Sequence, residues 1–321
     1  MESPDKGLWA PEDIRDFLNG RLGRLHARQR LGIESEHDAR VFGPGLQFFH
    51  IESWYSIHSV IRTVLRLSGL YRRGQRNAAN VQVRRNTIVT SRLPDAFDGF
   101  TILHISDLHA DMNQPAMQRV IALLPSLSYD ICVLTGDFRG STFGSFVQAI
   151  GGTAEVAAAL HGPSYGVLGN HDTIRMVPAL EAMGIRILLN ECVTIDRGDS
   201  RLYLAGIDDA HFFRADNIEK AGDLIPEGAF AMLLSHTPEV YRQAAHAGFD
   251  VMLSGHTHGG QICLPGGVAI TIDSKLPRRL GAGAWTHEGM AGYTSVGAGC
   301  STVAARFHCL PEITLHRLQR R

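Results

Sequence analysis

The sequence predicts a layered α/β fold, and three observations lead to this class. Short, unbroken apolar runs recur after about residue 80, as expected of strands that are covered on both faces. Helical stretches separate several of these runs, which is typical of sheets packed against helices. Residues 1–80 instead carry many arginines and few strand-like runs, which indicates helices. We therefore divide the chain into a helical, arginine-rich extension over 1–80 and an α/β domain over 81–321.

The composition is that of a folded chain. Of 321 residues, 44% are hydrophobic and 20% are charged, which argues against a disordered or collagen-like protein. The net charge of −1 gives no electrostatic reason to expect a nucleic acid polymer as partner. Five cysteines without a Cys-x-x-Cys pair indicate neither a disulfide framework nor a thiolate zinc site. Since we find no signal segment and no apolar run long enough to span a bilayer, we expect a cytoplasmic protein.

The arginine-rich segment 51–92 is positively charged, although the chain as a whole is nearly neutral. From Ile51 to about Leu70, apolar residues fall at three- and four-residue steps, which predicts an amphipathic helix. Residues 51–92 hold eight arginines, no lysine and one acidic residue. Two interpretations stay open: a packed helix with a solvated basic face, or a contact with an anionic substrate or a membrane surface. The second would place the protein peripherally at the inner membrane face.

From residue 81 onward the apolar runs predict strands. Val81–Val89 alternates like an edge strand. The runs predicted as buried strands are 100–105, 131–134, 165–168, 202–205, 231–234 and 251–253. We expect helices over Pro115–Leu124 and Pro238–Ala247. The longest interval between polar motifs runs from residue 171 to residue 236, and strands predicted at 185–189 and 202–207 fill much of it. An internal lid therefore has little room. Residues 1–80 are the candidate cover instead.

Polar side chains follow five of these runs directly. In chain order they are Asp107 and His109, then Asp137, then Asn170 and His171, then His236, and finally His256 and His258. Because ligands bind beyond the carboxyl ends of strands in α/β sheets, we expect these side chains to share one site. Imidazole, carboxylate and amide ligands without thiolate suit Mn, Fe or Zn. The set exceeds what one ion needs, so we infer two divalent metal ions, with manganese favoured.

The remaining histidines need a separate interpretation, because the chain contains 16 of them. Histidine is the commonest metal ligand, but a lone histidine is more often a structural or surface residue. We interpret His104, His161, His211 and His246 in this second way.

The five motifs resemble, in order, those of the calcineurin-like metallophosphoesterases. They are Asp107-x-His109, Gly136-Asp137, Gly169-Asn170-His171, His236 and Gly255-His256-x-His258. The resemblance spans about residues 81–318 and implies an α/β/β/α sandwich. The stretches Gly255–Gln261 and Pro311–Leu315 are similar to a bacterial branch of membrane-associated phosphodiesterases. That branch includes a UDP-2,3-diacylglucosamine pyrophosphatase of lipid A synthesis.

The resemblance also implies a role for each motif residue. Asp107, His109 and His258 would hold the first metal, Asn170, His236 and His256 the second, and Asp137 would bridge both. His171 would contact the phosphate and assist the leaving oxygen. Arg139 is a candidate bidentate donor to a phosphate oxygen, with a structural ion pair as the alternative. Asp172 is a candidate to orient the His171 imidazole, with an exposed turn residue as the alternative.

The leading hypothesis is therefore a two-metal hydrolase of phosphodiester or pyrophosphate bonds. The favoured substrate is a lipid-linked nucleotide such as UDP-2,3-diacylglucosamine, since the basic amphipathic segment suits a phosphate head with an apolar tail. The alternatives are a soluble phosphodiesterase for cyclic or other small nucleotides, and a catalytically silent scaffold. A protein phosphatase is disfavoured, because the residues after Asp137 and His171 differ from the pattern of those enzymes.

Overall fold

The computed structural model describes residues 10–42, 60–301 and 303–321. Within these residues the strands form two six-stranded sheets and one two-stranded ribbon. Sheet A contains, in spatial order, β1 (Gln82–Thr90), β14 (Glu312–Arg320), β2 (Thr101–Ile105), β3 (Ile131–Leu134), β4 (Ser164–Gly166) and β5 (Ile185–Ile187). Sheet B contains β12 (Gly283–His287), β13 (Met290–Thr294), β9 (Val251–Ser254), β8 (Ala231–Leu234), β7 (Ser200–Gly206) and β6 (Glu191–Arg197). The ribbon pairs β10 (Cys263–Leu264) with β11 (Val268–Ala269).

Strand direction explains where the polar motifs meet. In sheet A, β2, β3, β4 and β5 are parallel neighbours. In sheet B, β7, β8, β9 and β13 are parallel neighbours. The carboxyl ends of each parallel group therefore open at one edge of its sheet, as ligand sites in such folds require. The predicted edge strand is confirmed, since β1 lies at the edge of sheet A beside β14.

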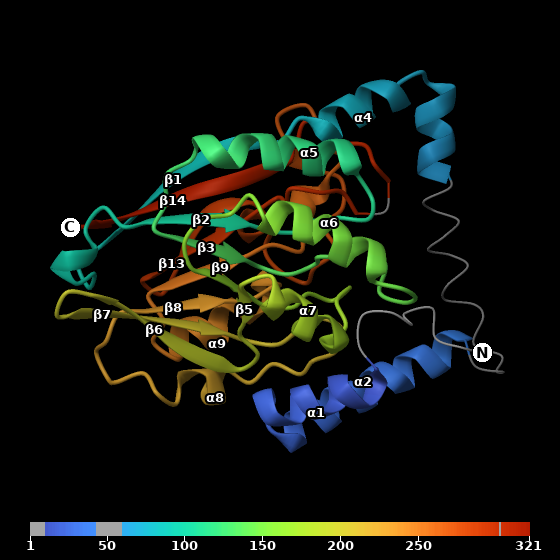
Figure 1. Cartoon of the computed structure of the whole chain (residues 1–321). Coiled ribbons are helices and arrows are strands. Elements are labelled where there is room, and N and C mark those ends of the chain that lie inside the picture. Colours follow the sequence, from blue (N-terminus) through green and yellow to red (C-terminus); the bar gives the residue numbers. More distant parts are fainter. Residues whose placement is uncertain (1–9, 43–59, 302) are drawn as a thin grey trace.

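Helices flank both sheets (Figure 1). The α-helices are α1 (Pro11–Leu22), α2 (Arg24–Phe42), a helix over residues 60–67, α4 (Tyr71–Ala79), α5 (Gln114–Leu123), α6 (Val147–Ala157), α7 (Val177–Ala182), α8 (Ile218–Gly222) and α9 (Tyr241–His246). Short 3-10 helices are η1 (Asp95–Phe97), η2 (Leu124–Ser126), η3 (Ile174–Met176), η4 (Pro238–Val240), η5 (His258–Gly260) and η6 (Arg278–Leu280).

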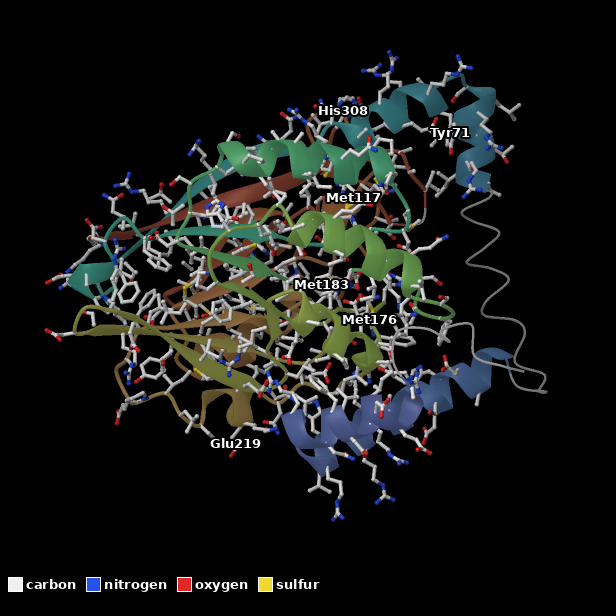
Figure 2. All side chains as sticks on the ribbon, viewed as in Figure 1. Tyr71, Met117, Met176, Met183, Glu219 and His308 are labelled. Atoms are coloured by element: carbon white, nitrogen blue, oxygen red, sulfur yellow. The ribbon has the colours of Figure 1, made fainter. Side chains whose placement is uncertain are left out.

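Three hydrophobic clusters hold the layers together. One lies between the sheets and includes Ile102 of sheet A and Leu253 of sheet B. A second joins sheet A to α5, α6 and α7, and includes Met117 and Met176, which are labelled in Figure 2. The third joins sheet B to α8 and α9, with Leu233 at its centre. These layers confirm the predicted α/β/β/α class.

The described part of residues 1–80 is helical, as predicted. Ile14, Leu18 and Leu22 of α1 are buried in the same cluster as α7, so the first two helices share the core of the main body. The predicted amphipathic helix is helical over 60–67, and its first part, 51–59, lies outside the described residues. Among the helices of the described segments, none combines the length and apolarity that a membrane span needs.

Several predicted elements have bounds in the structure that differ from the predicted ones, and two of them illustrate the differences. The strand expected over 165–168 is β4, Ser164–Gly166, and the buried residues Val167 and Leu168 follow it as loop. The helix expected over Pro238–Ala247 is divided between η4 and α9. The difference at β4 arises because an apolar run indicates burial, and burial continues past the last hydrogen-bonded residue of the strand.

Candidate metal centre

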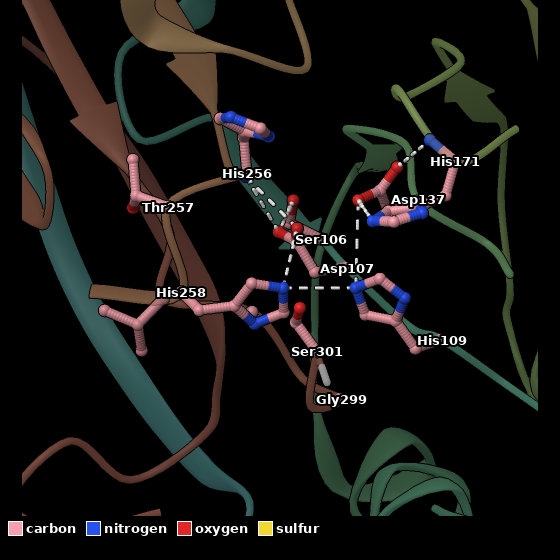
Figure 3. A network of polar contacts seen from close by, with 12 residues as sticks. Ser106, Asp107, His109, Asp137, His171, His256, Thr257, His258, Gly299 and Ser301 are labelled. Atoms are coloured by element: carbon pink, nitrogen blue, oxygen red, sulfur yellow. Dashed lines mark hydrogen bonds and ion pairs between the residues drawn. The ribbon is translucent and has the colours of Figure 1, made fainter. Parts of the chain in front are cut away.

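Three side chains from the ends of β2 and β9 form the first cluster: Asp107, His109 and His258 (Figure 3). All three are buried, and one ligand atom of each lies within 4.8 Å of the others. His109 Nε2 lies 3.1 Å from His258 Nε2, and His258 Nε2 lies 3.5 Å from Asp107 Oδ1. The structure thus brings together the three residues that were expected at the first metal.

The second cluster combines Asp137, His236 and His256, from the ends of β3, β8 and β9. His236 Nε2 lies 3.3 Å from Asp137 Oδ2 and 3.2 Å from His256 Nδ1. The Oδ1 atom of Asn170 lies 2.9 Å from His236 Nε2 and 2.8 Å from His256 Nδ1. All four residues expected at this second position therefore converge on it.

Asp137 lies between the two clusters. Its Oδ2 atom is 3.3 Å from His236 Nε2 and 3.7 Å from His109 Nε2, while its Oδ1 accepts a hydrogen bond from the His171 backbone. Burial opposes the charged carboxylate, but His236 and His171 outweigh it and hold the pKa of Asp137 well below its usual range. A single ionised carboxylate is therefore shared by both clusters.

The polarity of these contacts fits metal ions. His109 Nδ1 faces the Arg139 carbonyl at 2.9 Å, and His236 Nδ1 faces the Thr135 carbonyl at 2.7 Å. Each neutral ring must therefore donate from Nδ1, which leaves a lone pair on Nε2 directed into the centre. These lone pairs meet the oxygens of Asp137 and Asn170, which are acceptors as well. Acceptors that converge in this way suit a cation between them.

In the metal-free protein a proton can replace one such cation. Burial disfavours the charged form of His236, but Asp137 and Asp107 outweigh it and raise the pKa of His236 to about 10. Burial and neighbouring cationic groups hold the pKa values of His256 and His258 well below the usual range. Since a metal must displace the His236 proton, metal affinity at the second cluster should rise with pH.

The backbone at the strand ends is unusual and explains how so many ligands converge. Asp107, His109, Asp137, His256 and His258 all have φ between 40° and 70°. Left-handed backbone costs a non-glycine residue roughly 1–2 kcal/mol, so these sharp turns are held by the packing around them. Neighbouring glycines make the close approach feasible: a Cβ on Gly169 would lie 2.2 Å from Asp137 Oδ1, and one on Gly255 would lie 2.3 Å from Asp107 Oδ2.

His171 lies at the rim of the centre, as its place after Asn170 suggested. Its imidazole Nε2 is 3.9 Å from Asp137 Oδ2, and its side chain is 25% exposed. Its Nδ1 atom lies 2.7 Å from the hydroxyl of Thr142. Among the motif side chains it combines proximity to Asp137 with access for a ligand from solvent.

Arg139 and Asp172 have contacts that differ from the expected ones. The Arg139 guanidinium donates to the backbone carbonyls of His171, Thr142 and Gly144, and the residue is only 3% exposed. The guanidinium N–H groups of Arg139 are therefore used by backbone carbonyls of the loop around His171. The Asp172 carboxylate accepts from the backbone of Gly169, Phe138 and Arg139 instead of orienting the His171 ring. Both residues join the two loops that carry Asp137 and His171.

A buried ion-pair network connects helix α2 to the same loops. Arg30 donates to Glu34 at 2.8 Å, to Asp208 at 3.2 Å and to the carbonyl of Asp172 at 3.1 Å, and it is fully buried. Glu34 accepts from the backbone of Ile174 at 2.7 Å. Arg30 and Glu34 of α2 therefore form hydrogen bonds with the segment that directly follows Asn170 and His171.

His211, which the sequence analysis interpreted as a structural or surface histidine, lies beside the second cluster. Its ring centroid lies 4.3 Å from that of His256, and its Nδ1 lies 2.9 Å from Glu239 Oε2. The hydrogen bond with Glu239 raises the pKa of His211, against the effect of burial. The sequence offers only a weak signal, since His211 comes four residues after the apolar run 202–207, and Asp208 and Asp209 come first.

The pair of His211 and Glu239 leads to a prediction about pH. Three hydrogen bonds outweigh burial and lower the pKa of Glu239 to about 2, so it stays charged above pH 5. Because the folded-state pKa of His211 is raised, its stabilising contribution is present below the unfolded value and is lost as pH rises through the folded value. Glu239→Gln should therefore cost about 1.5–3 kcal/mol at pH 5.5 and less at pH 9. Urea unfolding of the metal-free protein at both pH values measures this.

The exposed Glu219 of α8, labelled in Figure 2, provides the control. Glu219→Gln should leave stability unchanged at both pH values. An equal loss at pH 5.5 and pH 9 in Glu239→Gln would show that His211 is not protonated through this contact.

Comparison with known proteins agrees with the geometry. Residues 100–260, half of the chain, match the family model for calcineurin-like phosphoesterases. YkoQ, an uncharacterized metallophosphoesterase of Bacillus subtilis (strain 168), is 30% identical over 257 residues, covering 77% of this chain and 93% of YkoQ. Phosphodiesterase YaeI of Escherichia coli (strain K12) is 27% identical, covering 68% of this chain and 82% of YaeI. A transmembrane protein with a metallophosphoesterase domain from Danio rerio is 29% identical, covering 75% of this chain and 56% of that protein.

Proposed function

Since this chain belongs to the calcineurin-like phosphoesterase family and is a metal-dependent phosphoesterase, we propose that it hydrolyses phosphodiester or pyrophosphate bonds at two divalent ions. Asp107, His109 and His258 would hold the first ion, and Asn170, His236 and His256 the second. Asp137 would bridge the two ions. The observation that carries this proposal is the convergence of the two buried clusters on one shared carboxylate.

When bound, such ions supply positive charge to the phosphoryl oxygens and lower the pKa of an attacking water, with manganese as our favoured metal. The protein's own residues supply the rest. The Asp137 carboxylate offsets the repulsion between two cations. His171, partly exposed and beside Asp137, contacts the phosphate and gives a proton to the leaving oxygen. Arg139 positions His171 through its hydrogen bond to the His171 carbonyl.

The proposed substrate class is a lipid-linked nucleotide such as UDP-2,3-diacylglucosamine. The helix over 60–67 exposes apolar and basic side chains together: Val64 is 57% and Leu67 84% exposed, beside the exposed Arg62 and Arg66. Such a surface suits contact with acyl chains and anionic head groups. Its opposite face packs Leu65 against Val303 and Ala305.

The position of this helix relative to the centre also supports the proposal. The loop that carries Val303 begins near Gly299, whose backbone donates to the Asp107 carbonyl at 2.8 Å. The helix that carries the apolar and basic surface therefore packs on a loop that also contacts Asp107 of the first cluster. We keep residues 1–80 as a proposed extension that covers the domain over 81–321. The relative from Danio rerio, a transmembrane protein by name, is consistent with a place at a membrane.

Turnover of three substrates tests the proposal: a nitrophenyl phosphodiester, a cyclic nucleotide and a UDP-linked lipid. We expect metal-dependent turnover of the first and the highest kcat/KM for the lipid. Turnover of the cyclic nucleotide alone would favour the soluble phosphodiesterase instead. No turnover of any substrate by protein with two bound ions would favour the silent scaffold.

The arginines near the exposed helix lead to a second prediction. Arg62, Arg66, Arg72 and Arg73 are exposed, and each should contribute about 1 kcal/mol to binding of an anionic membrane when it lies close to the surface. Changing all four to glutamine should abolish sedimentation with phosphatidylglycerol vesicles and reduce lipid turnover. High salt should weaken wild-type binding in the same way.

A matched variant controls for the loss of positive charge. It changes four exposed arginines elsewhere, Arg186, Arg197, Arg242 and Arg317, to glutamine. This control should sediment like the wild type, and both variants should keep turnover of the soluble diester. If the first variant sediments like the wild type, the membrane interpretation fails, and the segment is a packed helix with a solvated basic face.

A further inference from the structure

A line of buried polar side chains crosses sheet A and ends at Asp107. His316 Nδ1 lies 3.0 Å from the Asn86 amide nitrogen, and His316 Nε2 lies 3.2 Å from His104 Nδ1. His104 Nε2 lies 2.9 Å from Thr135 Oγ1. These residues stand on β1, β14 and β2 and directly after β3, which are four neighbouring strands of the sheet.

Two hydroxyls complete the connection. The Thr135 hydroxyl donates to Ser106 Oγ at 2.7 Å, and the Ser106 hydroxyl donates to Asp107 Oδ2 at 2.6 Å. Ser106, Thr135, His104 and His316 are each at most 1% exposed, whereas Asn86 on the edge strand is half-buried. The line therefore runs from the surface of the sheet to the first cluster through residues that bulk water does not reach.

The chemistry of the groups determines the direction of every hydrogen bond. Ser106 donates its one proton to Asp107 Oδ2, as it must when the carboxylate is ionised to hold a metal ion. Ser106 must then accept from Thr135, and Thr135 from His104 Nε2. A neutral His104 consequently accepts at Nδ1 from His316 Nε2, and His316 accepts at Nδ1 from the Asn86 amide. All five contacts are consistent with this one assignment.

Both histidines are suited to remain neutral. Burial lowers the pKa of His104 to about 3, and burial together with His104 holds the pKa of His316 well below its usual range. Their rings contact Tyr293 of sheet B edge to face, at centroid distances of 6.3 and 4.7 Å. They therefore serve as fixed dipoles within the inter-sheet core.

We infer that Ser106, Thr135, His104 and His316 form a one-directional hydrogen-bond chain that positions the Asp107 carboxylate for the first metal ion. Every donor points toward Asp107, so each bond polarises the next and strengthens the last one. Ser106 donates to Oδ2, the backbone N–H of His256 lies 3.1 Å from both carboxylate oxygens, and Oδ1 lies 3.5 Å from His258 Nε2. The inference rests on the proposed metal role of Asp107 and adds four positioning residues to it.

The first test is the protonation pattern of the two rings. Ring nitrogen NMR shifts of the metal-free protein at neutral pH should show both His104 and His316 protonated at Nε2 only. A proton on Nδ1 of His104 would reverse the direction of the chain and overturn the inference.

The second test is a pair of substitutions read by Mn²⁺ binding in a calorimetric titration. Ser106→Ala should weaken the first site about 10–100-fold, the usual range for a residue that orients a ligand. Thr135→Val should weaken Mn²⁺ binding at the same site by a smaller factor. Thr135→Ser keeps the hydroxyl and should bind Mn²⁺ at this site like the wild type. The double variant should match Ser106→Ala alone, because Thr135 acts through Ser106. Additive losses, or equal weakening of both sites, would overturn the inference.

Two controls separate this inference from its premise. Thr153 is a fully buried threonine of α6 whose hydroxyl has no partner among the described residues, so Thr153→Val should change neither site. Asp107→Asn should weaken Mn²⁺ binding at the first site, and the binding event that it weakens in the titration is thereby assigned to that site. If Asp107→Asn changes neither site, the proposed metal role of Asp107 fails. If it weakens the first site and Ser106→Ala does not, the chain alone is refuted.

Discussion

Replacing Asp137 with asparagine should remove both metal ions together and lower activity on the order of 10³-fold or more. The Asp137 carboxylate, which we propose as the bridge, lies within 4 Å of the imidazoles of His236 and His109, one from each cluster. Without its charge, two cations would repel each other across the site. Bound metals contribute several kcal/mol to stabilisation of the transition state, and about 1.4 kcal/mol corresponds to a factor of ten in rate. Metal analysis of the purified variant, beside its turnover of the nitrophenyl diester, measures both effects.

Two further variants define the specificity of this result. Asp250→Asn removes a buried carboxylate that pairs with Arg92 before the first residue of β9, at the end of this strand opposite to the one that leads to His256, and should keep both metals. Asn170→Ala should weaken binding of the second ion more than binding of the first, since Asn170 Oδ1 contacts His236 and His256 of the second cluster. If Asp137→Asn retains one ion at full affinity, the bridging assignment is wrong.

The second large effect is expected for His171→Ala, which should lose activity roughly 10²–10⁴-fold, as removal of a general acid does. Metal content should stay at the wild-type level, because the His171 ring lies 3.9 Å from Asp137 and is outside both buried clusters. The ratio of turnover to bound metal therefore distinguishes the two roles. A substrate with a better leaving group should be affected less by the substitution.

His246→Ala is the matched control, since His246 is an exposed histidine at the end of α9. It should change neither turnover nor metal content. Should the metal content of His171→Ala fall as far as that of His256→Ala, His171 would be a metal ligand.

The sequence predicted the residues of the centre because each motif is local. Asp107, Asp137 and His236 each lie two or three residues after the end of a short apolar run, so one pattern indicates both the strand and the site residue at its end. Parallel strands then bring such groups to one edge. After residues 202–207 the same pattern indicates Asp208 and Asp209, and His211 comes four residues after the run, so the pattern alone does not select it.

The partners of these residues could not be predicted in the same way. Arg30 meets Asp208 across a sequence separation of 178 residues, and no periodicity in α2 indicates that pairing. Arg139 has a sequence position that suits a phosphate contact, yet its guanidinium is used by carbonyls, whose positions depend on the folded loop. His104 and His316 resemble core histidines by pattern, and only their tertiary contacts reveal a directed chain.

The position of β14 has a consequence for the order of synthesis. β14 lies between β1 and β2, and 212 residues separate His104 of β2 from His316 of β14. At about 5–20 residues per second, a ribosome needs roughly 10–40 s to make that stretch. During this time the edge of β2 that pairs with β14 in the finished sheet carries unpaired backbone groups. Such an edge can pair with a strand of another chain. The nascent chain should therefore need chaperone protection until β14 emerges, and the ordered centre should form only after that strand has been inserted.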